Sequence, residues 1–284
     1  GGIKSDLTIS RLEENKFWVL AGAGNGMIDL SWLRENAPDD GSVNIIDWTS
    51  AYAGIGLWGP NSRKVLESLC EDDDVSNEQF PFFSIKNISI SHVPCVAVRI
   101  SYIGELGWEI YTPTEYGLTL WDELRSKSQE FNMICSGAGA FESLRLEKGY
   151  RSLGSDIHTN TNPYEAGLGF TVKLKKENNF IGKEALMKFK ESPLKKKLCC
   201  MVMDDSEGMA LGKEPIYDSH GKSVGYVTST NYGYYVDKHI IYGYLPNDYS
   251  GEGTKLELDY FGKRYPITVT KEPLLDPENN RLKS

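Results

Sequence analysis

The sequence has little of the material from which metal, disulfide and serine-hydrolase sites are built. Its 284 residues include five cysteines, two of them adjacent at positions 199 and 200, and no Cys-x-x-Cys pair. The four histidines are not at metal-ligand spacing, and no Gly-x-Ser-x-Gly motif is present. We therefore expect no disulfide framework, no metal site and no nucleophilic serine, and we place the protein in a reducing compartment.

Long apolar runs and an excess of positive charge are also missing. No hydrophobic stretch approaches the roughly 18–20 residues that a membrane-spanning helix needs. The 31 Lys and Arg residues are outnumbered by 40 Asp and Glu, which gives a formal net charge of −9. Because a surface that binds nucleic acid is typically basic, we expect neither a nucleic acid nor a membrane as a partner.

The remaining composition is that of a folded globular protein. Hydrophobic residues make up 40% of the chain and charged residues 25%, and the length suits one large domain or two ordinary ones. The polar, basic segment 192–197 (SPLKKK) separates mixed patterns from a region of strand and turn patterns. We predict an α+β body over residues 1–190 and a small β-domain over residues 191–284.

Hydrophobic periodicity and turn residues locate the elements of the first region. Helices are expected at 25–36, 118–131 and 138–148, with another opened by Gly59-Pro60. Gly149 is expected to end the helix before it. The expected strands are 7–12 and 17–20, which form a hairpin, and 43–47, 53–58, 81–88, 93–102 and 108–111.

A glycine cluster at residues 22–26 (GAGNG) lies between an expected strand and an expected helix. A phosphate-binding turn is conceivable there, which leaves a nucleotide-dependent oxidoreductase as one hypothesis. The spacing lacks the third glycine of the dinucleotide fingerprint, and the chain does not alternate strand and helix as that fold requires. An ordinary tight turn is therefore the favoured interpretation.

Two acidic residues could carry chemistry. Strand alternation in residues 108–111 (WEIY) puts Glu109 and Tyr111 on one face, with Trp108 and Ile110 on the other. A carboxylate beside phenol rings could bind a flat heterocycle that offers two parallel N–H donors, or Glu109 could be a solvated strand residue. Asp6 could likewise be a turn cap. The pattern alone leaves these alternatives open.

Several segments, in order along the chain, resemble the aminomethyltransferase (glycine-cleavage T-protein) family. Residues 1–8 (GGIKSDLT) are similar to its catalytic strand, residues 101–111 (SYIGELGWEIY) to its folate-reading hairpin, and residues 143–151 (SLRLEKGYR) to its central helix. Residues 162–169 with 180–183, and then 225–229 with 243–246, resemble the stretches that follow. Each motif is weak alone, but the ordered series is specific and covers nearly the whole chain.

The finer similarity is to the folate half of dimethylglycine and sarcosine dehydrogenases or oxidases. It rests on residues 4–8 (KSDLT), 147–151 (EKGYR) and 231–236 (NYGYYV). In those proteins an FAD-binding, amine-oxidising half precedes the folate half. This chain contains no such half and lacks the first part of the folate body. We therefore expect a fragment, with FAD only in a missing N-terminal half.

The resemblance implies a three-lobed, N-terminally truncated folate-binding body and a C-terminal β-barrel. The implied activity transfers a one-carbon unit from a methylated amine or its iminium to tetrahydrofolate, forming 5,10-methylenetetrahydrofolate. An FAD-binding oxidase half is the implied partner. The implied location is the cytoplasm, or the mitochondrial matrix if the source is eukaryotic. A non-catalytic binding or regulatory module of the same fold is the alternative.

The resemblance also assigns roles to residues. The catalytic carboxylate of the family falls on Asp6, where it would stabilise a positively charged donor. The pterin-reading carboxylate falls on Glu109, which would accept the two neighbouring N–H donors of the pterin ring. The other pocket positions that the resemblance implies are Thr8, Gly22, Tyr102, Ile110 and Tyr111.

Overall fold

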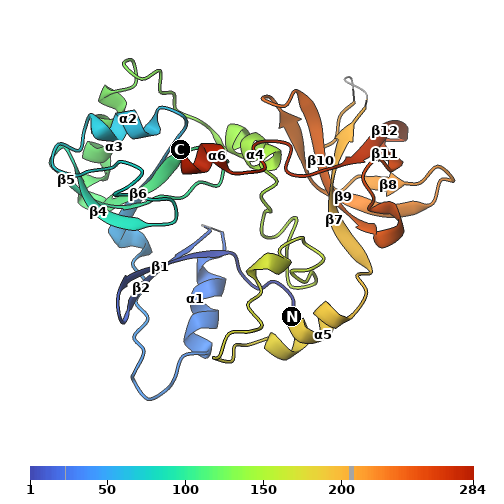
Figure 1. Ribbon diagram of the computed structural model, residues 1–284, viewed down its shortest axis with the longest axis horizontal. Coiled ribbons are helices and arrows are strands. Elements are labelled where there is room, and N and C mark those ends of the chain that lie inside the picture. The colour runs from blue at the N-terminus through green and yellow to red at the C-terminus, as the bar shows by residue number, and fades with distance from the viewer. Residues whose placement is uncertain (23, 205–207) are drawn as a thin grey trace. The chain divides into compact units, whose positions relative to one another are not determined.

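The computed structural model describes residues 1–22, 24–204 and 208–284 (Figure 1). The chain divides into two compact units, one formed by residues 1–5 and 138–277 and the other by residues 6–137 and 278–284. The domain boundary that the sequence predicts between residues 190 and 191 was placed where the strand and turn patterns begin, and this boundary stays a prediction. Among the described helices, none is both long and apolar enough to cross a membrane.

The unit built from residues 6–137 begins with the predicted hairpin. Strands β1 (Leu7–Glu13) and β2 (Lys16–Ala21) pair antiparallel, with Thr8 opposite Leu20 and Ser10 opposite Trp18. Helix α1 (Gly26–Glu35) follows, as predicted, and a short 3-10 turn η1 (Thr49–Ala51) leads into the next strand. The hairpin thus places residues 8, 10, 18 and 20 on one face.

A four-stranded antiparallel sheet forms the centre of this unit. Its strand order is β3 (Tyr52–Trp58), β6 (Gly107–Pro113), β5 (Val93–Val98) and β4 (Ile85–Ile90). Helices α2 (Ser62–Glu67) and α3 (Gly117–Ser126) contribute Leu66 and Leu120 to the core on one face of the sheet. Turn η2 (Thr114–Tyr116) precedes α3, and the C-terminal helix α6 (Asn280–Lys283) also belongs to this unit.

Four sequence predictions need correction in this unit. Strand β5 ends at Val98, four residues before the predicted end. Residues 43–47 form no strand, because a strand exists only when a neighbour pairs with it, and Val43 and Ile46 are 49% and 60% exposed. Strand β4 begins at Ile85 rather than at residue 81, after Phe83 takes a φ of 65° that a strand cannot accommodate. Helix α3 ends at Ser126, five residues before the predicted end.

The unit built from residues 138–277 begins with α4 (Ala138–Glu147), which the sequence located closely. Gly149 has a φ of 73°, the left-handed conformation that ends a helix and favours glycine, so the predicted stop is confirmed. Irregular segments and a short turn η3 (Gly169–Thr171) then lead to α5 (Lys183–Glu191). No residue of α5 is buried.

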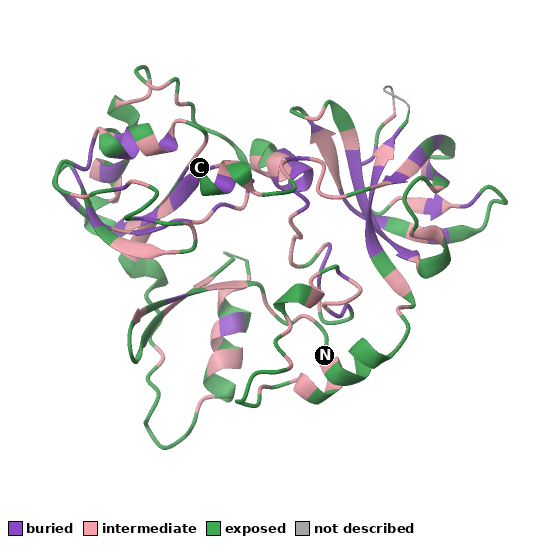
Figure 2. Cartoon of the chain, viewed as in Figure 1, coloured by how far each residue is buried: buried purple, intermediate pink, exposed green. Residues whose placement is uncertain are grey.

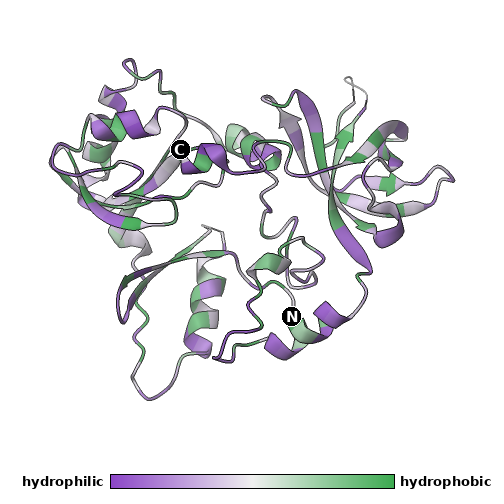
Figure 3. Cartoon of the chain, in the orientation of Figure 1, coloured by the Kyte–Doolittle hydropathy of each residue, from purple (hydrophilic) through white to green (hydrophobic). Residues whose placement is uncertain are grey.

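A closed β-barrel completes this unit and confirms the predicted C-terminal barrel. Its strands close in the order β10-β7-β12-β11-β8-β9. Figure 2 shows buried residues gathered along the barrel strands and the β3–β6 sheet, and Figure 3 shows hydrophobic and hydrophilic residues mixed along the same strands. The six strands are β7 (Lys196–Met203), β8 (Pro215–Tyr217), β9 (Ser223–Gly233), β10 (Lys238–Pro246), β11 (Lys255–Tyr260) and β12 (Lys263–Thr270), with turn η4 (Asn247–Tyr249) after β10.

Candidate functional site

Strand β6 carries Glu109 and Tyr111 on the face of the sheet that is turned away from the core. Trp108 and Ile110 are 0% exposed and belong to the core, whereas Glu109 and Tyr111 are half-buried. The predicted alternation is therefore confirmed. Because the side chain of Ile110 points into the core, only its backbone is available beside Glu109.

Glu109 and Tyr111 are joined by a hydrogen bond. The Tyr111 hydroxyl donates to Oε2 of Glu109 at 2.6 Å. Burial raises the pKa of Tyr111, and the negative charge of Glu109 raises that pKa further, so the phenol keeps its proton and stays a donor. Oε1 of Glu109 has no hydrogen-bond partner among the residues that the structure describes. The pair thus offers an oriented carboxylate with acceptor capacity to spare.

Glycines on the neighbouring strand leave room for rings around Glu109. In the β3–β6 register, Gly54 lies opposite Tyr111 and Gly56 lies opposite Glu109, and both glycines are exposed. A Cβ atom at Gly54 would lie 3.0 Å from Cε1 of Tyr111, and one at Gly56 would lie 2.0 Å from the Trp58 ring. The two rings therefore occupy the space that side chains at these positions would take.

An aromatic cluster that the sequence reasoning missed extends from Tyr111 to the hairpin. Trp18 of β2 makes edge-to-face contacts with Tyr52, at 5.0 Å between ring centroids, and with Tyr111, at 6.0 Å. Tyr52 in turn stacks on Trp48 at 5.9 Å. Hairpin alternation does put Trp18 on one face with Ser10, but nothing local in the sequence says which sheet that face meets.

Asp6 and Thr8 come from the strand that pairs with the strand of Trp18. Asp6 immediately precedes β1, two residues before Thr8, which shares the Trp18 face of the hairpin with Ser10. Asp6 as a whole is exposed, but protein atoms around its carboxyl group desolvate that group and raise its pKa. A carboxylate with a raised pKa accepts a proton more readily than a fully solvated one.

The two other predicted positions lie in loops of the same unit. Tyr102 is half-buried in the loop between β5 and β6. Gly22 follows β2, and its carbonyl accepts a hydrogen bond from the backbone N–H of Asn25 at 2.9 Å. This is the bond of a tight turn, while Ala23 within the same cluster lies outside the described residues. The named strands of the described chain all pair antiparallel, so they contain no βαβ nucleotide-binding unit.

Possible metal ligands and thiols are located among the described residues. No group of three or more His, Cys, Asp or Glu side chains in that part of the chain is placed to hold a metal ion. All five cysteines are free. Burial raises the pKa of Cys70 and Cys200 to about 12 and that of Cys95 and Cys199 to about 11, so these four thiols stay protonated and unreactive at neutral pH.

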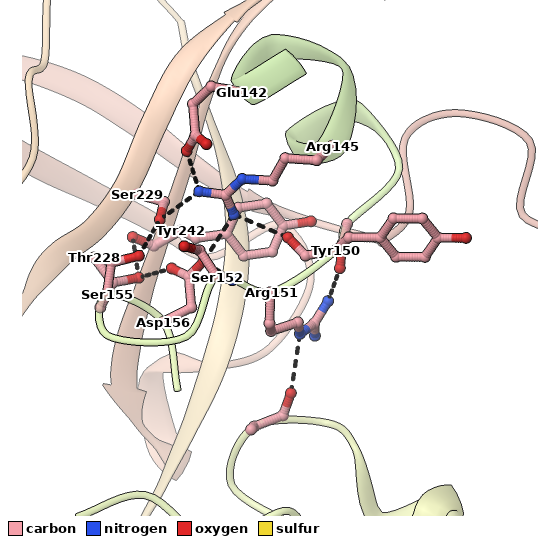
Figure 4. Close-up of polar contacts among 12 residues, drawn as sticks. Glu142, Arg145, Tyr150, Arg151, Ser152, Ser155, Asp156, Thr228, Ser229 and Tyr242 are labelled. Carbon is pink, nitrogen blue, oxygen red and sulfur yellow. Dashed lines mark hydrogen bonds and ion pairs between the residues drawn. The ribbon is translucent and has the colours of Figure 1, made fainter. Parts of the chain in front are cut away.

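A buried polar network in the other unit accounts for the motif SLRLEKGYR (Figure 4). Arg145 of α4 forms an ion pair with Asp156 at 2.7 Å, and both side chains are 1% exposed. Arg145 also donates to Ser229 of β9 at 2.8 Å, and Thr228 donates to the second carboxylate oxygen of Asp156. Glu147 accepts hydrogen bonds from two backbone N–H groups of the β9–β10 turn. The motif thus attaches α4 to the barrel.

Comparisons with known proteins agree with this architecture. The family model of the GCVT N-terminal domain matches residues 1–176, and that of the glycine cleavage T-protein C-terminal barrel domain matches residues 196–276. The human protein named dimethylglycine dehydrogenase, mitochondrial, is 38% identical over 285 residues, which cover 99% of this chain and 33% of that protein. The chain therefore spans about a third of the length of that relative.

Two further relatives are named aminomethyltransferases. That of Halothermothrix orenii is 33% identical over 97% of this chain and 75% of its own length. The crystal structure of the glycine cleavage system aminomethyltransferase T from Bartonella henselae superimposes with a TM-score of 0.85 at 26% identity, over 96% of this chain and 73% of that one. Together with the two matching family models, these similarities show that the chain belongs to the glycine cleavage T-protein family of aminomethyltransferases.

Proposed function

We propose that this chain binds a reduced folate at Glu109 and transfers a one-carbon unit to it from a methylated amine, forming 5,10-methylenetetrahydrofolate. The observation that carries the proposal is the Glu109–Tyr111 pair. One carboxylate oxygen is held by the phenol at 2.6 Å, and the other has no hydrogen-bond partner among the described residues. The folate-binding character of the family supports it. Gly54 and Gly56 leave the space that the Tyr111 and Trp58 rings occupy.

The residues present suit a pterin ring. A pterin edge offers an N–H and an amino group side by side, and a carboxylate accepts both as charge-assisted hydrogen bonds. The Tyr111 bond leaves this capacity intact, because each carboxylate oxygen has two lone pairs. Thr8, Tyr102 and the backbone near Gly22 and Ile110 are the further positions that we assign to the pocket.

Asp6 is proposed as the catalytic carboxylate. An iminium donor carries a positive charge that a nearby carboxylate stabilises. When the iminium carbon bonds to two folate nitrogens, each nitrogen loses its proton. One of the two protons leaves on the released amine. Asp6 accepts the other, a role that its raised pKa favours. When bound, tetrahydrofolate supplies the two nucleophilic nitrogens, and the chain supplies the charge and the proton acceptor.

The source of the iminium is the second part of the proposal. Because the human dehydrogenase relative is about three times as long as this chain, we assign the chain to the folate half of such an enzyme. An FAD-binding oxidase half would deliver the iminium of dimethylglycine or sarcosine. The location would follow that of the relatives, the mitochondrial matrix for a eukaryotic source and the cytoplasm otherwise.

The reaction can be tested without the oxidase half. Formaldehyde and sarcosine condense to the same iminium that oxidation of dimethylglycine yields, so a mixture of both with tetrahydrofolate supplies all reactants. We expect the chain to accelerate formation of 5,10-methylenetetrahydrofolate, followed by absorbance, and Asp6→Asn to lower the catalysed rate about 100-fold.

Asp40→Asn is the matched control, because Asp40 is an exposed loop residue of the same unit. Its rate is expected to equal that of the original chain. If Asp6→Asn also equals the original chain, Asp6 is not the catalytic carboxylate. If the folded chain binds folate but never accelerates the reaction, it is a binding module.

A further inference from the structure

Trp18 is the described residue through which the hairpin of Asp6 and Thr8 makes ring contact with the sheet of Glu109. Its ring meets Tyr52 of β3 edge-to-face at an interplanar angle of 78°, and Tyr111 of β6 at 88°. Edge-to-face contacts are favourable and directional, so they define how two aromatic residues lie. The hairpin is thereby held against β3 and β6 at the position of Trp18.

The side chains on the opposite face of the hairpin are largely exposed. Ile9, Phe17 and Val19 are 63%, 52% and 41% exposed, whereas Ser10, which pairs with Trp18, is 8% exposed. A two-stranded hairpin is at best marginally stable on its own, so its position depends on the face that is packed. That face carries Trp18 and Thr8, and Asp6 lies two residues before Thr8, just outside the strand.

Tyr111 extends the connection to Glu109. Its ring lies against Gly54 and meets Trp18, and its hydroxyl donates to Oε2 of Glu109. A tilt of the Tyr111 ring would therefore move the phenol oxygen that orients the carboxylate. Trp18 is therefore placed to influence Glu109 through Tyr111, and Asp6 through the hairpin.

We infer that Trp18 is a positioning residue of the folate site. It keeps the Tyr111 hydroxyl on Glu109 and keeps the hairpin that carries Asp6 and Thr8 beside the same pair. This inference rests on the proposed function, because it states how the proposed pocket is held together.

The test is a titration of the full 284-residue chain with 5-formyltetrahydrofolate, a stable reduced folate. We expect Trp18→Leu to weaken binding about tenfold, and Trp18→Phe, which keeps a ring edge, to restore most of the affinity. Phe17→Leu is the matched control, since it removes a ring from the neighbouring residue on the exposed face of the same strand and should bind normally.

A second comparison separates positioning from general destabilisation. If Trp18 acts through the phenol, Trp18→Leu should cost less affinity in a Tyr111→Phe chain, which keeps the ring but lacks the hydroxyl. A purely structural loss would be the same in both backgrounds. Should Trp18→Leu fail to fold, Trp18→Met fills much of the volume without a ring and is compared in its place.

The outcomes separate this inference from the proposed function. If the original chain binds folate and Glu109→Gln weakens that binding, but Trp18→Leu behaves like Phe17→Leu, the inference is wrong and the function stands. Equal losses for Trp18→Leu with and without the Tyr111 hydroxyl also overturn it. If the folded original chain binds no reduced folate, the proposed function fails and the inference fails with it.

Discussion

At the scale of single residues, Asp6 shows most directly how the stability of the fold conflicts with the proposed catalytic role. Desolvation raises the pKa of this carboxyl group, so the fold favours its protonated form. The fold gains from Asp6 below the unfolded value of 3.8, and that gain is lost as the pH rises through the higher folded value. At neutral pH the ionised carboxylate therefore opposes folding, which is consistent with the catalytic role proposed for it.

Asp6→Asn is accordingly predicted to raise the free energy of unfolding at pH 7 and to leave it unchanged at about pH 3.5. Urea denaturation at the two pH values measures this difference. Asp40→Asn is predicted to act in the opposite direction, because hydrogen bonds from Ser42 lower the pKa of Asp40 and stabilise its ionised form. A loss of stability in Asp6→Asn at pH 7 would show that the carboxylate is favourably placed in the fold.

Strand alternation was sufficient to place Glu109 and Tyr111 together, because residues two apart on a strand share a face whatever surrounds them. The contact of Trp18 with Tyr111 could not be predicted in the same way. These residues are far apart in sequence, on strands that do not pair, and their contact depends on how the hairpin packs. The sequence therefore predicted which side chains share a face of one strand, but it did not predict which side chains meet when two sheets pack together.

At the scale of secondary-structure elements, the pairing of β3 with β6 determines which side chains fit beside Glu109 and Tyr111. The register sets Gly54 and Gly56 opposite the two candidate ligand-binding residues, where rings rather than Cβ atoms fill the space. The sequence predicted strands over 53–58 and 108–111 but not their pairing, so it did not indicate why these glycines are needed. Residues 43–47 failed as a strand for the related reason that no partner was there.

Gly56→Ala is predicted to destabilise the chain by about 1–3 kcal/mol, because the added methyl group would overlap the Trp58 ring and force it to move. Chemical denaturation measures the loss. Gly24→Ala is the control, since a Cβ atom there meets no atom of the described residues within 4 Å. Equal stability of the two variants would mean that the Trp58 ring moves aside without cost.

Helix α4 is attached to the barrel by the buried Arg145–Asp156 pair, and Asp156→Asn is predicted to cost about 3 kcal/mol of stability. The variant removes the buried counter-charge of Arg145 and leaves it paired with Glu142, whose side chain is 41% exposed. Glu13→Gln breaks the exposed Lys16–Glu13 pair, whose side chains are 55% and 69% exposed, and should cost under about 1 kcal/mol. Similar losses measured by denaturant titration would contradict the assignment of Arg145 and Asp156 as the anchor of α4.

At the scale of the whole molecule, the predicted α+β class with a C-terminal β-barrel is confirmed. The change from mixed to strand-only patterns near residue 191 was enough to predict the barrel sequence. It could not show that residues 138–191 share a compact unit with the barrel, because that grouping depends on contacts such as Arg145 with Ser229. The local sequence pattern was therefore enough to predict the fold class, whereas the division into two compact units depends on long-range contacts.

The central claim is that Glu109 reads a reduced folate, and calorimetric titration of 5-formyltetrahydrofolate into the full chain tests it most directly. Loss of a charge-assisted contact predicts that Glu109→Gln binds about tenfold or more weakly than the original chain. Glu115→Gln, which changes an exposed glutamate just beyond β6, should bind like the original chain. Equal affinity of Glu109→Gln and the original chain, or no binding by a folded original chain, would contradict the claim.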